Sequence, residues 1–287
     1  MAINAQEFDT LVKPKNGWFD IHLKEVWAYR DLALLFVKRN FISLYKQTVL
    51  GPAWAIIQPL LTTVIFTVIF GGIAKLSPNG INGFVYYLCG NIFWQYFGSS
   101  LSSTSSTFTA NSGIFGKVYF PRLVLPISTV ITNLISLGIQ FVFFIVAWTI
   151  FMFMPDNIMQ PSWLIALVPA LVIEMALLAM GFGIIISALT TKYRDLTMLV
   201  GFGVSLWMYA TPVAYSSTLF SGTRWDTLYW CNPMTSILET IKYAFMGPAA
   251  AQYRPVFLLI SVAITAVVLF IGVIMFSRVE RTFMDTV

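Results

Sequence analysis

The chain has 287 residues, of which 58% are hydrophobic and only 10% are charged, and its formal net charge is +5. Because soluble domains carry about 25% charged residues, this composition excludes an ordinary soluble domain and indicates an integral membrane protein. The single histidine excludes His-pair metal motifs, no P-loop string occurs, and the two cysteines fit no metal or redox spacing. We therefore expect a chain without catalytic residues, metal or bound cofactor. Its surroundings are expected to be membrane lipids, and no nucleic-acid partner is expected.

Residues 1–52 are predicted to form a cytoplasmic N-terminal segment that carries one amphipathic helix between Lys24 and Leu50. Basic residues recur near one face of this helix, and apolar residues lie roughly opposite. Such a helix is expected to lie along the inner leaflet, with its basic side chains toward lipid phosphates. Gly51 and Pro52 then break the helix where the chain enters the membrane.

Hydropathy predicts a six-helix transmembrane domain over residues 53–277. The six spans are expected at 53–74, 84–107, 125–153, 163–190, 197–214 and 255–277. An even number of crossings places both termini on one side. If that side is the cytoplasm, thirteen Lys and Arg residues lie inside and four outside. The positive-inside rule therefore predicts that both termini are cytoplasmic, including a tail at 278–287.

The second predicted span is divided in composition. Its outer half is aromatic and contains Tyr86, Tyr87, Trp94 and Tyr96, whereas its inner half, GSSLSSTSSTFT, consists mostly of hydroxyl residues. The aromatic side chains either form a belt at the membrane interface or stack on sugar rings that pass through the protein. The hydroxyl groups suit a polar path or a subunit contact better than lipid, although some can bond back to the preceding helical turn.

Glu174 is the ionisable residue that lies deep in a predicted span. Because a carboxylate at the membrane centre costs about 2.5–3.5 kcal/mol on insertion scales, its side chain is expected to face protein or water. A structural hydrogen-bonding role and a role in lining or gating a pore both remain open. The same span carries Ala179, Gly183 and Ser187 at four-residue intervals, a pattern typical of close helix packing.

The stretch CNPMTSILETIKYAFMG, residues 231–247, is predicted to be a helix that does not cross the membrane. Asn232 can cap it, Pro233 suits its first turn, and Gly247 ends it. About fifteen residues at 1.5 Å each reach roughly 22 Å, which is short of a hydrocarbon core near 30 Å thick. It lies within an outer region, 215–254, that either forms two re-entrant helices or lies flat in the interface.

Five strings occur in order along the chain: LYKQTVLGPAWAIIQPL, GKVYFPRLVLP, TKYRDL, ATPVAY and NPMTSILETIKYAFMG. Together they make residues 24–287 resemble the membrane subunit of type-two ABC exporters of the polysaccharide branch. That branch includes the O-antigen, capsule and teichoic-acid permeases. The chain before about residue 24 is not part of the shared pattern.

The resemblance implies an all-α integral membrane protein of the bacterial inner membrane. It implies an N-terminal interface helix, six spans, and two short re-entrant helices before the last span. The protein is then expected to be a homodimer that associates with two copies of a separate ATP-binding-cassette ATPase. The ATPase would bind ATP and Mg²⁺, and the membrane subunit would move a lipid-linked polysaccharide outward.

Three groups of functional residues follow from these patterns. The first cytoplasmic loop, 108–124, is expected to contact the ATPase through Phe115, Lys117, Tyr119 and Arg122. In the second loop, 190–196, Arg194 and Asp195 either contact the ATPase or form a salt bridge that holds that corner. The substrate path is expected to be lined by Tyr86, Tyr87, Trp94, Tyr96, Ser102, Ser106 and Glu174. The outer gate is expected to be formed by Trp225, Tyr229, Trp230 and Glu239.

Two other functions compete with this one. An exporter of small amphiphiles or drugs would have a similar topology, but the polysaccharide-type strings and the aromatic second span argue against it. A membrane-embedded lipid-sugar transferase would need a cluster of acidic or histidine residues at one membrane face. Glu174, Asp195 and Glu239 are assigned to different depths, so the sequence favours transport.

Overall fold

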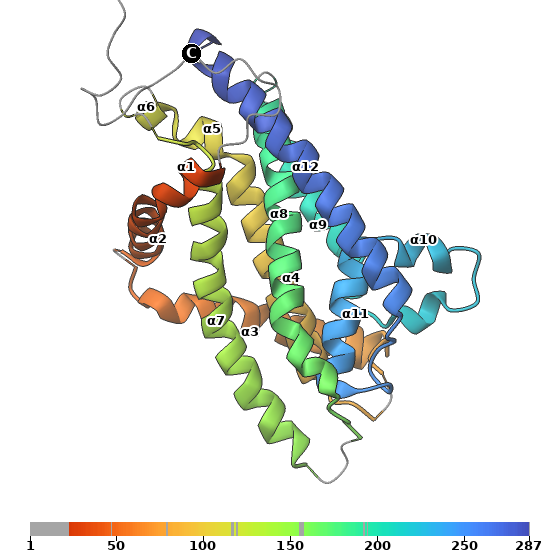
Figure 1. The fold of residues 1–287 in the computed structure, drawn as a ribbon. Coiled ribbons are helices and arrows are strands. Elements are labelled where there is room, and N and C mark those ends of the chain that lie inside the picture. The colour runs from red at the N-terminus through yellow and green to blue at the C-terminus, as the bar shows by residue number, and fades with distance from the viewer. Residues whose placement is uncertain are drawn as a thin grey trace, which may run out of the picture.

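A computed structural model describes residues 23–46, 48–78, 80–115, 118, 120–154, 158–191, 193 and 195–286. Within these ranges the chain is helical and contains no strand, which confirms the predicted all-α class (Figure 1). The helices are, in chain order, α1 (Leu23–Ala28), α2 (Arg30–Tyr45), η2 (Gly51–Ala53), α3 (Trp54–Phe66), η3 (Thr67–Ile73), α4 (Gly83–Ser105), α5 (Thr107–Ala110), α6 (Ser112–Phe115), α7 (Val124–Met152), η4 (Trp163–Leu167), α8 (Val168–Thr190), α9 (Leu196–Tyr209), η5 (Ser217–Phe220), α10 (Asp226–Trp230), α11 (Pro233–Met246) and α12 (Pro255–Thr286).

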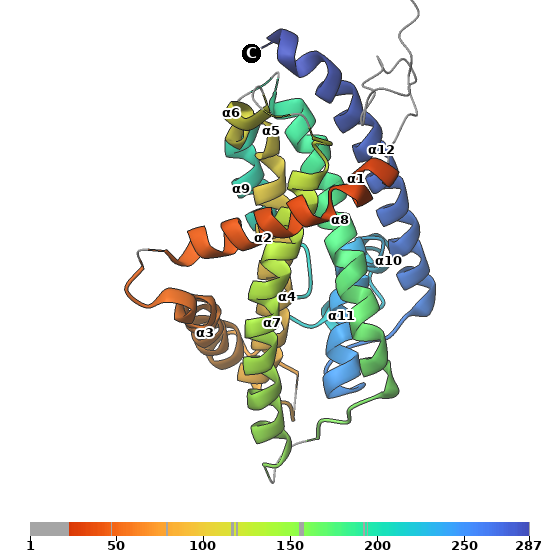
Figure 2. The same ribbon diagram turned by 60° about the vertical axis from the view of Figure 1, so that its left-hand side comes forward.

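The long helices α4, α7, α8 and α12 form the body of the molecule. α8 packs against both α4 and α12, and α7 packs against α4. Figures 1 and 2 show α1, α5, α6 and the end of α12 toward one end of this bundle, and the C-terminal end of α7 at the other. The core lies around α4, where every residue from Val85 to Phe97 except Gln95 is buried.

Four helical segments among the described residues are long and apolar enough to cross a membrane. They are Gly51–Ile73, Val124–Met152, Trp163–Thr190 and Pro255–Val279. α4 has 23 residues, enough for a crossing, but its second half is rich in hydroxyl groups. α9 has only 14 residues, about 21 Å of helix, and is too short by itself. The count of six spans therefore stays a prediction.

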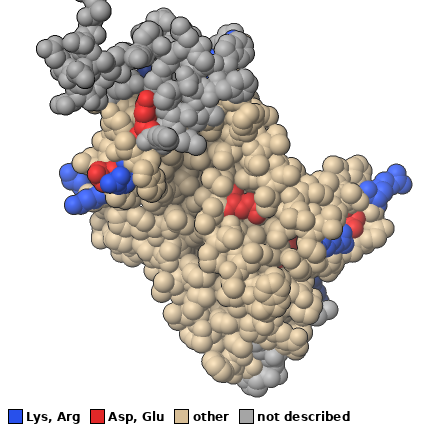
Figure 3. Space-filling model, viewed as in Figure 1, with Lys and Arg blue, Asp and Glu red and all other residues tan. Residues whose placement is uncertain are grey.

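α3 is oriented differently from the long helices. Both ribbon views show it lying across α4 and α7 instead of alongside them (Figures 1 and 2), and it contacts both. Many of its apolar side chains are exposed, among them Leu61, Val64 and Ile65. On the face in Figure 3, Lys and Arg side chains gather over α2 and near α10, and the surface between them is mostly uncharged, with a small patch of Asp or Glu near its centre. A mostly uncharged surface suits contact with hydrocarbon.

The hydroxyl groups after the aromatic half of α4 bond mainly to their own backbone. Ser105 Oγ donates to Ser102 O at 2.7 Å, Ser106 Oγ to Ser103 O at 3.0 Å, and Thr107 Oγ1 to Thr104 O at 2.7 Å. Such bonds compete with the helical ladder. They accompany the end of α4 at Ser105, after which the chain continues as the separate turn α5.

The predicted small-residue stripe of the fourth span is confirmed as a packing surface. Ala179 is fully buried, and a Cβ added at Gly183 would lie 2.5 Å from Thr104 Cβ on α4. Ser187 Oγ accepts a hydrogen bond from Phe108 N at 3.2 Å. Because there is no room for a larger side chain at Gly183, α8 and α4 approach closely at this point.

Candidate functional site

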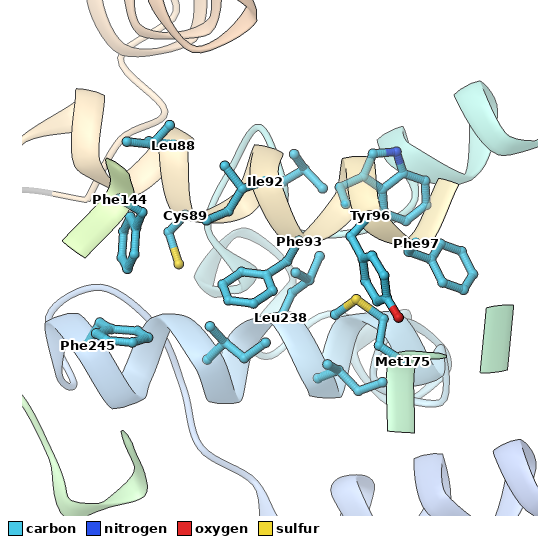
Figure 4. Packing of buried hydrophobic residues seen from close by; sticks show 14 of the residues in the cluster. Leu88, Cys89, Ile92, Phe93, Tyr96, Phe97, Phe144, Met175, Leu238 and Phe245 are labelled. Atoms are coloured by element: carbon cyan, nitrogen blue, oxygen red, sulfur yellow. The ribbon is translucent and has the colours of Figure 1, made fainter. Parts of the chain in front are cut away.

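α11 is a short helix enclosed by protein. All of its residues are buried except Tyr243, which is half-buried. It packs against α12, η4, α8, α4 and α10. Figure 4 shows Leu238 and Phe245 of α11 facing Cys89, Phe93 and other side chains of α4. At 14 residues it is about 21 Å long, so the predicted length and bounds of this helix are confirmed.

The N-terminal end of α11 is held by Asn232. Its Oδ1 accepts hydrogen bonds from Met234 N at 3.2 Å and from Trp207 Nε1 at 3.1 Å, and its Nδ2 donates to Ala210 O at 3.1 Å. The first helical amides lack partners within the helix, so a cap of this kind supplies one. Asn232 therefore joins the start of α11 to the end of α9. The sequence predicted Asn232 as a cap but did not predict this contact with α9.

The C-terminal end of α11 is held by the connection between α7 and α8. Gln160 N donates to Met246 O at 3.2 Å, Ser162 N to Ala244 O at 2.9 Å, and Trp148 Nε1 to Phe245 O at 2.9 Å. These three are among the last carbonyl groups of the helix, which accept no hydrogen bond from an amide of the same helix. Both ends of α11 are thus satisfied by protein, so a helix too short to reach water on both sides can still be buried.

Glu239 and Lys242 are fully buried in the middle of α11. Glu239 Oε2 accepts from Ser217 Oγ at 2.5 Å and from Gln252 N at 3.0 Å. Lys242 Nζ donates to Pro212 O and lies 3.8 Å from the centroid of the Tyr86 ring. Burial raises the pKa of the Glu239 carboxyl and lowers the pKa of Lys242 to about 8. Through these contacts α11 holds two segments: the one before α10, which contains Pro212 and Ser217, and the one after α11, which contains Gln252.

The residues predicted to form an outer gate are only partly brought together. Tyr229 stacks on Phe220 with ring centroids 4.4 Å apart, and Trp230 is buried beneath Arg254, whose guanidinium lies 4.6 Å from the ring. Arg254 also pairs with Asp226 at 2.8 Å. Trp225, in contrast, is 59% exposed. Glu239 is buried in the network described above, and the gating role of the four residues stays a prediction.

The aromatic side chains of α4 face protein. Tyr86 and Tyr87 have no exposed surface, and Trp94 and Tyr96 are 6% and 3% exposed. Tyr86 OH donates to Tyr215 O at 2.9 Å, which ties α4 to the outer region. This burial is at odds with a belt that faces lipid. The role of the four residues, and of half-buried Ser102 and Ser106, in a substrate path stays a prediction.

Glu174 joins three helices. Ser261 Oγ of α12 donates a hydrogen bond to Glu174 Oε1 of α8, and Ser261 Oγ also lies 3.2 Å from Pro233 O at the start of α11. Glu174 is 8% exposed. This contact is the structural hydrogen bond considered for Glu174. A role of Glu174 in lining or gating a pore stays a prediction.

The loop between α4 and α7 is anchored by an aromatic cluster, formed by Phe36, Phe108, Phe115, Phe120 and Phe276. Phe108 stacks on Phe276 of α12 at 4.5 Å, and Phe120 lies 5.7 Å from Phe36 of α2. The Arg122 guanidinium lies 5.0 Å from the Phe115 ring centroid. Lys117, Tyr119 and Arg194 lie outside the described residues, and Asp195 is exposed just before α9. The loop is therefore fixed to both α2 and α12.

The sequence of the chain is similar to those of known proteins. The ABC-2 type transporter family profile matches residues 32–246. Two proteins of Klebsiella pneumoniae, each named O-antigen export system permease protein RfbA, are 28% identical to the chain over 257 residues, 89% of this chain and 94% of each relative. A protein of the same name from Myxococcus xanthus is 25% identical over 244 residues, 84% of this chain and 90% of the relative.

Gly247→Ala is expected to destabilise the outer region. Gly247 has a φ of 80°, and a Cβ there would lie 2.6 Å from Gln160 O, beside the amide that bonds to Met246. A backbone in this region costs a non-glycine residue about 1–3 kcal/mol, and the close contact adds to that cost. The measurement is the midpoint of thermal unfolding in detergent, which should fall.

Gly222→Ala is the matched control for this substitution. Gly222 also has a φ of 80°, but an added Cβ would meet nothing within 4 Å. Both variants place alanine at a positive φ, but only Gly247→Ala adds a contact with Gln160, so Gly247→Ala should lower the midpoint more. Equal midpoints would contradict the packing of α11 against residues 160–162.

Proposed function

The chain belongs to the ABC-2 type transporter family, and from this we propose that it is the membrane subunit of an ATP-driven exporter of a polysaccharide. The observation that carries the proposal is the extent of the match: the family profile covers residues 32–246, and three O-antigen export permeases align over most of their own length. The chain is a transport subunit and not an enzyme, and it resides in the inner membrane as a multi-pass protein.

We propose that the chain crosses the membrane six times, with both termini in the cytoplasm and with residues 215–254 at the outer face. The lysine and arginine distribution supports this orientation. The short length of α11 and its complete enclosure support a re-entrant helix over a crossing one. In this topology the aromatic cluster lies on the cytoplasmic side, and the Glu239 network lies near the outer one.

The proposal includes two further partners. A second copy of the chain would cover apolar surface such as that of α9, where Met198, Leu199, Phe202 and Leu206 are 86%, 59%, 64% and 52% exposed. Two copies of a separate ATPase would dock on the loops 108–124 and 190–196. That ATPase would bind ATP and Mg²⁺. The closure of the ATPase dimer on ATP would then displace these loops and so move the membrane helices.

The way in which the first loop is packed supports a role in coupling. Because the aromatic cluster joins it to α2 and α12, a displacement of the loop would move both helices. α12 also carries Ser261, which contacts Glu174 and the start of α11. A movement imposed at the loop therefore has a continuous packed route to the outer region.

The rival functions receive less support. Among the described residues, no three His, Cys, Asp or Glu side chains lie close enough to hold a metal. Glu174 and Glu239 are each occupied by serine hydroxyls in separate networks, so these two do not form a catalytic pair. An exporter of small amphiphiles is not favoured because the three relatives are named for O-antigen export.

Charge reversal at the first loop is expected to stop export. In a strain that lacks the chain, the wild-type chain should restore surface polysaccharide, whereas Lys117→Glu and Arg122→Glu should insert normally and fail to restore it. The physical reason is that a docking contact loses its attraction and gains repulsion. Arg224→Glu, the same change on the exposed outer region, is the control and should export normally. Full export by both loop variants would contradict the coupling role.

Cysteine labelling is expected to show that both ends of the outer region face outward. Ser221 and Ala249 are exposed, and they lie on either side of α11. In a background without Cys89 and Cys231, Ser221→Cys and Ala249→Cys should both react with an impermeant thiol reagent applied to spheroplasts. If Ala249→Cys reacts only after the membrane is disrupted, α11 crosses, and the re-entrant assignment is wrong.

A further inference from the structure

A polar cavity lies between α2, α3, α4 and α7, away from the outer region and from the aromatic cluster. Its volume is about 260 Å³. The polar side chains that line it are Tyr45, Gln58, Gln95, Tyr96, Ser99, Asn133, Ser136 and Gln140. Its apolar walls include Trp54, and none of the described residues that line it is charged. The cavity therefore offers uncharged donors and acceptors next to aromatic rings.

Several of these polar groups have no hydrogen-bond partner among the residues that the structure describes. Gln140 is only 6% exposed, and its Oε1 is buried without a hydrogen bond. The side chains of Gln58, Gln95 and Ser99 also have no hydrogen-bond partner among the described residues. A buried polar atom without a partner costs about 1–3 kcal/mol. This cost applies to Gln140, whose buried amide oxygen on a helix assigned to the membrane needs a polar occupant, whereas Gln95 is half-buried and Gln58 is exposed at the mouth of the cavity.

Three of the lining side chains, those of Tyr45, Asn133 and Ser136, form hydrogen bonds that close the wall of the cavity. Tyr45 OH of α2 lies 3.4 Å from Ser136 Oγ of α7, and Asn133 Nδ2 donates to Ser100 Oγ at 3.3 Å. These contacts hold α2 and α4 against α7. The amides of Gln95 on α4 and Gln140 on α7 thus belong to a wall that these contacts fix, as a binding site requires.

A second cavity adjoins the first on the side toward α2. It has a volume of about 320 Å³ and shares Leu44 and Asn133 with the first. Its lining includes Arg39, Asn40 and Ser103. Because α2 is the helix assigned to the inner leaflet, this second cavity gives a polar headgroup a route from the membrane surface to the amides.

The chemistry of the first cavity selects the class of ligand. A carboxamide both donates and accepts hydrogen bonds, as a sugar hydroxyl does. An ionic ligand would be left without a countercharge there. Pockets for drug-sized ligands have volumes of roughly 300–1,000 Å³, so a cavity of about 260 Å³ suits one ring and not a chain. Water alone would also fit, and it must be separated by experiment.

We propose that this amide cavity binds a single uncharged sugar ring of the exported glycan as its headgroup leaves the inner leaflet. The inference rests on the proposed function, because it takes the glycan to be the cargo. Gln58, Gln95 and Gln140 bond the ring hydroxyls, and Trp54 covers a ring face. The cavity acts before the translocation path and selects the sugar that may enter it.

Protection of a cysteine in the cavity tests binding directly. Ser99→Cys is made in a background without Cys89 and Cys231, and the complex with its ATPase is placed in lipid nanodiscs. Octyl β-D-glucoside, β-D-galactoside and β-D-mannoside, each below its micelle-forming concentration, serve as probes. At least one glycoside should slow thiol labelling several-fold, whereas octyl tetraethylene glycol ether, which has no sugar ring, should not.

Removal of one amide supplies the second arm of this test. Gln140→Leu breaks no hydrogen bond within the protein, so the fold should be kept, and protection should weaken about two- to tenfold. In cells the same variant should export less glycan with unchanged membrane insertion. Thr149→Val, on an exposed part of α7, is the control and should behave as wild type.

Three results would overturn the inference. They are equal protection by the glycosides and the ether, no protection by any probe, and protection that Gln140→Leu leaves unchanged. The second result would mean that the cavity holds only water. Failure of the proposed function is distinguishable, because then the wild-type chain would not restore surface glycan whatever the probes do at Ser99→Cys.

Discussion

The need to satisfy every backbone polar group of α11 inside the protein governs how residues 215–254 pack against the long helices. Hydrocarbon offers no hydrogen-bond partner, so a helix about 21 Å long must have both of its ends met by other segments. Asn232 meets one end, and the amides of Gln160 and Ser162 meet the other. These contacts hold the end of α9 and the segment just before η4 against α11. The enclosure of α11 then permits Glu239 and Lys242 to be buried, because each finds partners in the connections that surround it.

The close packing of α8 against α12 connects the two ends of the helix bundle. α8 and α12 approach so closely that a Cβ on Gly272 would lie 2.8 Å from Gly181 O. α12 carries Phe276 in the aromatic cluster at one end of the bundle and Ser261 beside Glu174 toward the other. Because close-packed helices move as units, the loop that we assign to the ATPase and the helix that we assign to the outer mouth are mechanically connected.

The sequence predicted the features that depend on local signals. The cap at Asn232, the stop at Gly247 and the stripe around Gly183 were all visible as patterns, and the structure has them. Contacts between distant segments were not predictable in this way: Trp207 with Asn232, and Gln160 with Met246, have no signature in either segment. The burial of Tyr86 and Tyr87 also escaped prediction, because an aromatic residue in a span suits lipid, sugar or protein equally well.

ATP-driven transfer in a purified system tests the account most directly. Proteoliposomes would contain the chain, its cognate ATPase and a lipid-linked glycan from the host, and a glycan-modifying enzyme added on one side would report which face each glycan occupies. The account predicts that glycan reaches the opposite face only when both proteins and ATP are present. Transfer by the chain without the ATPase, or ATP hydrolysis by the complex with no movement of glycan, would contradict it.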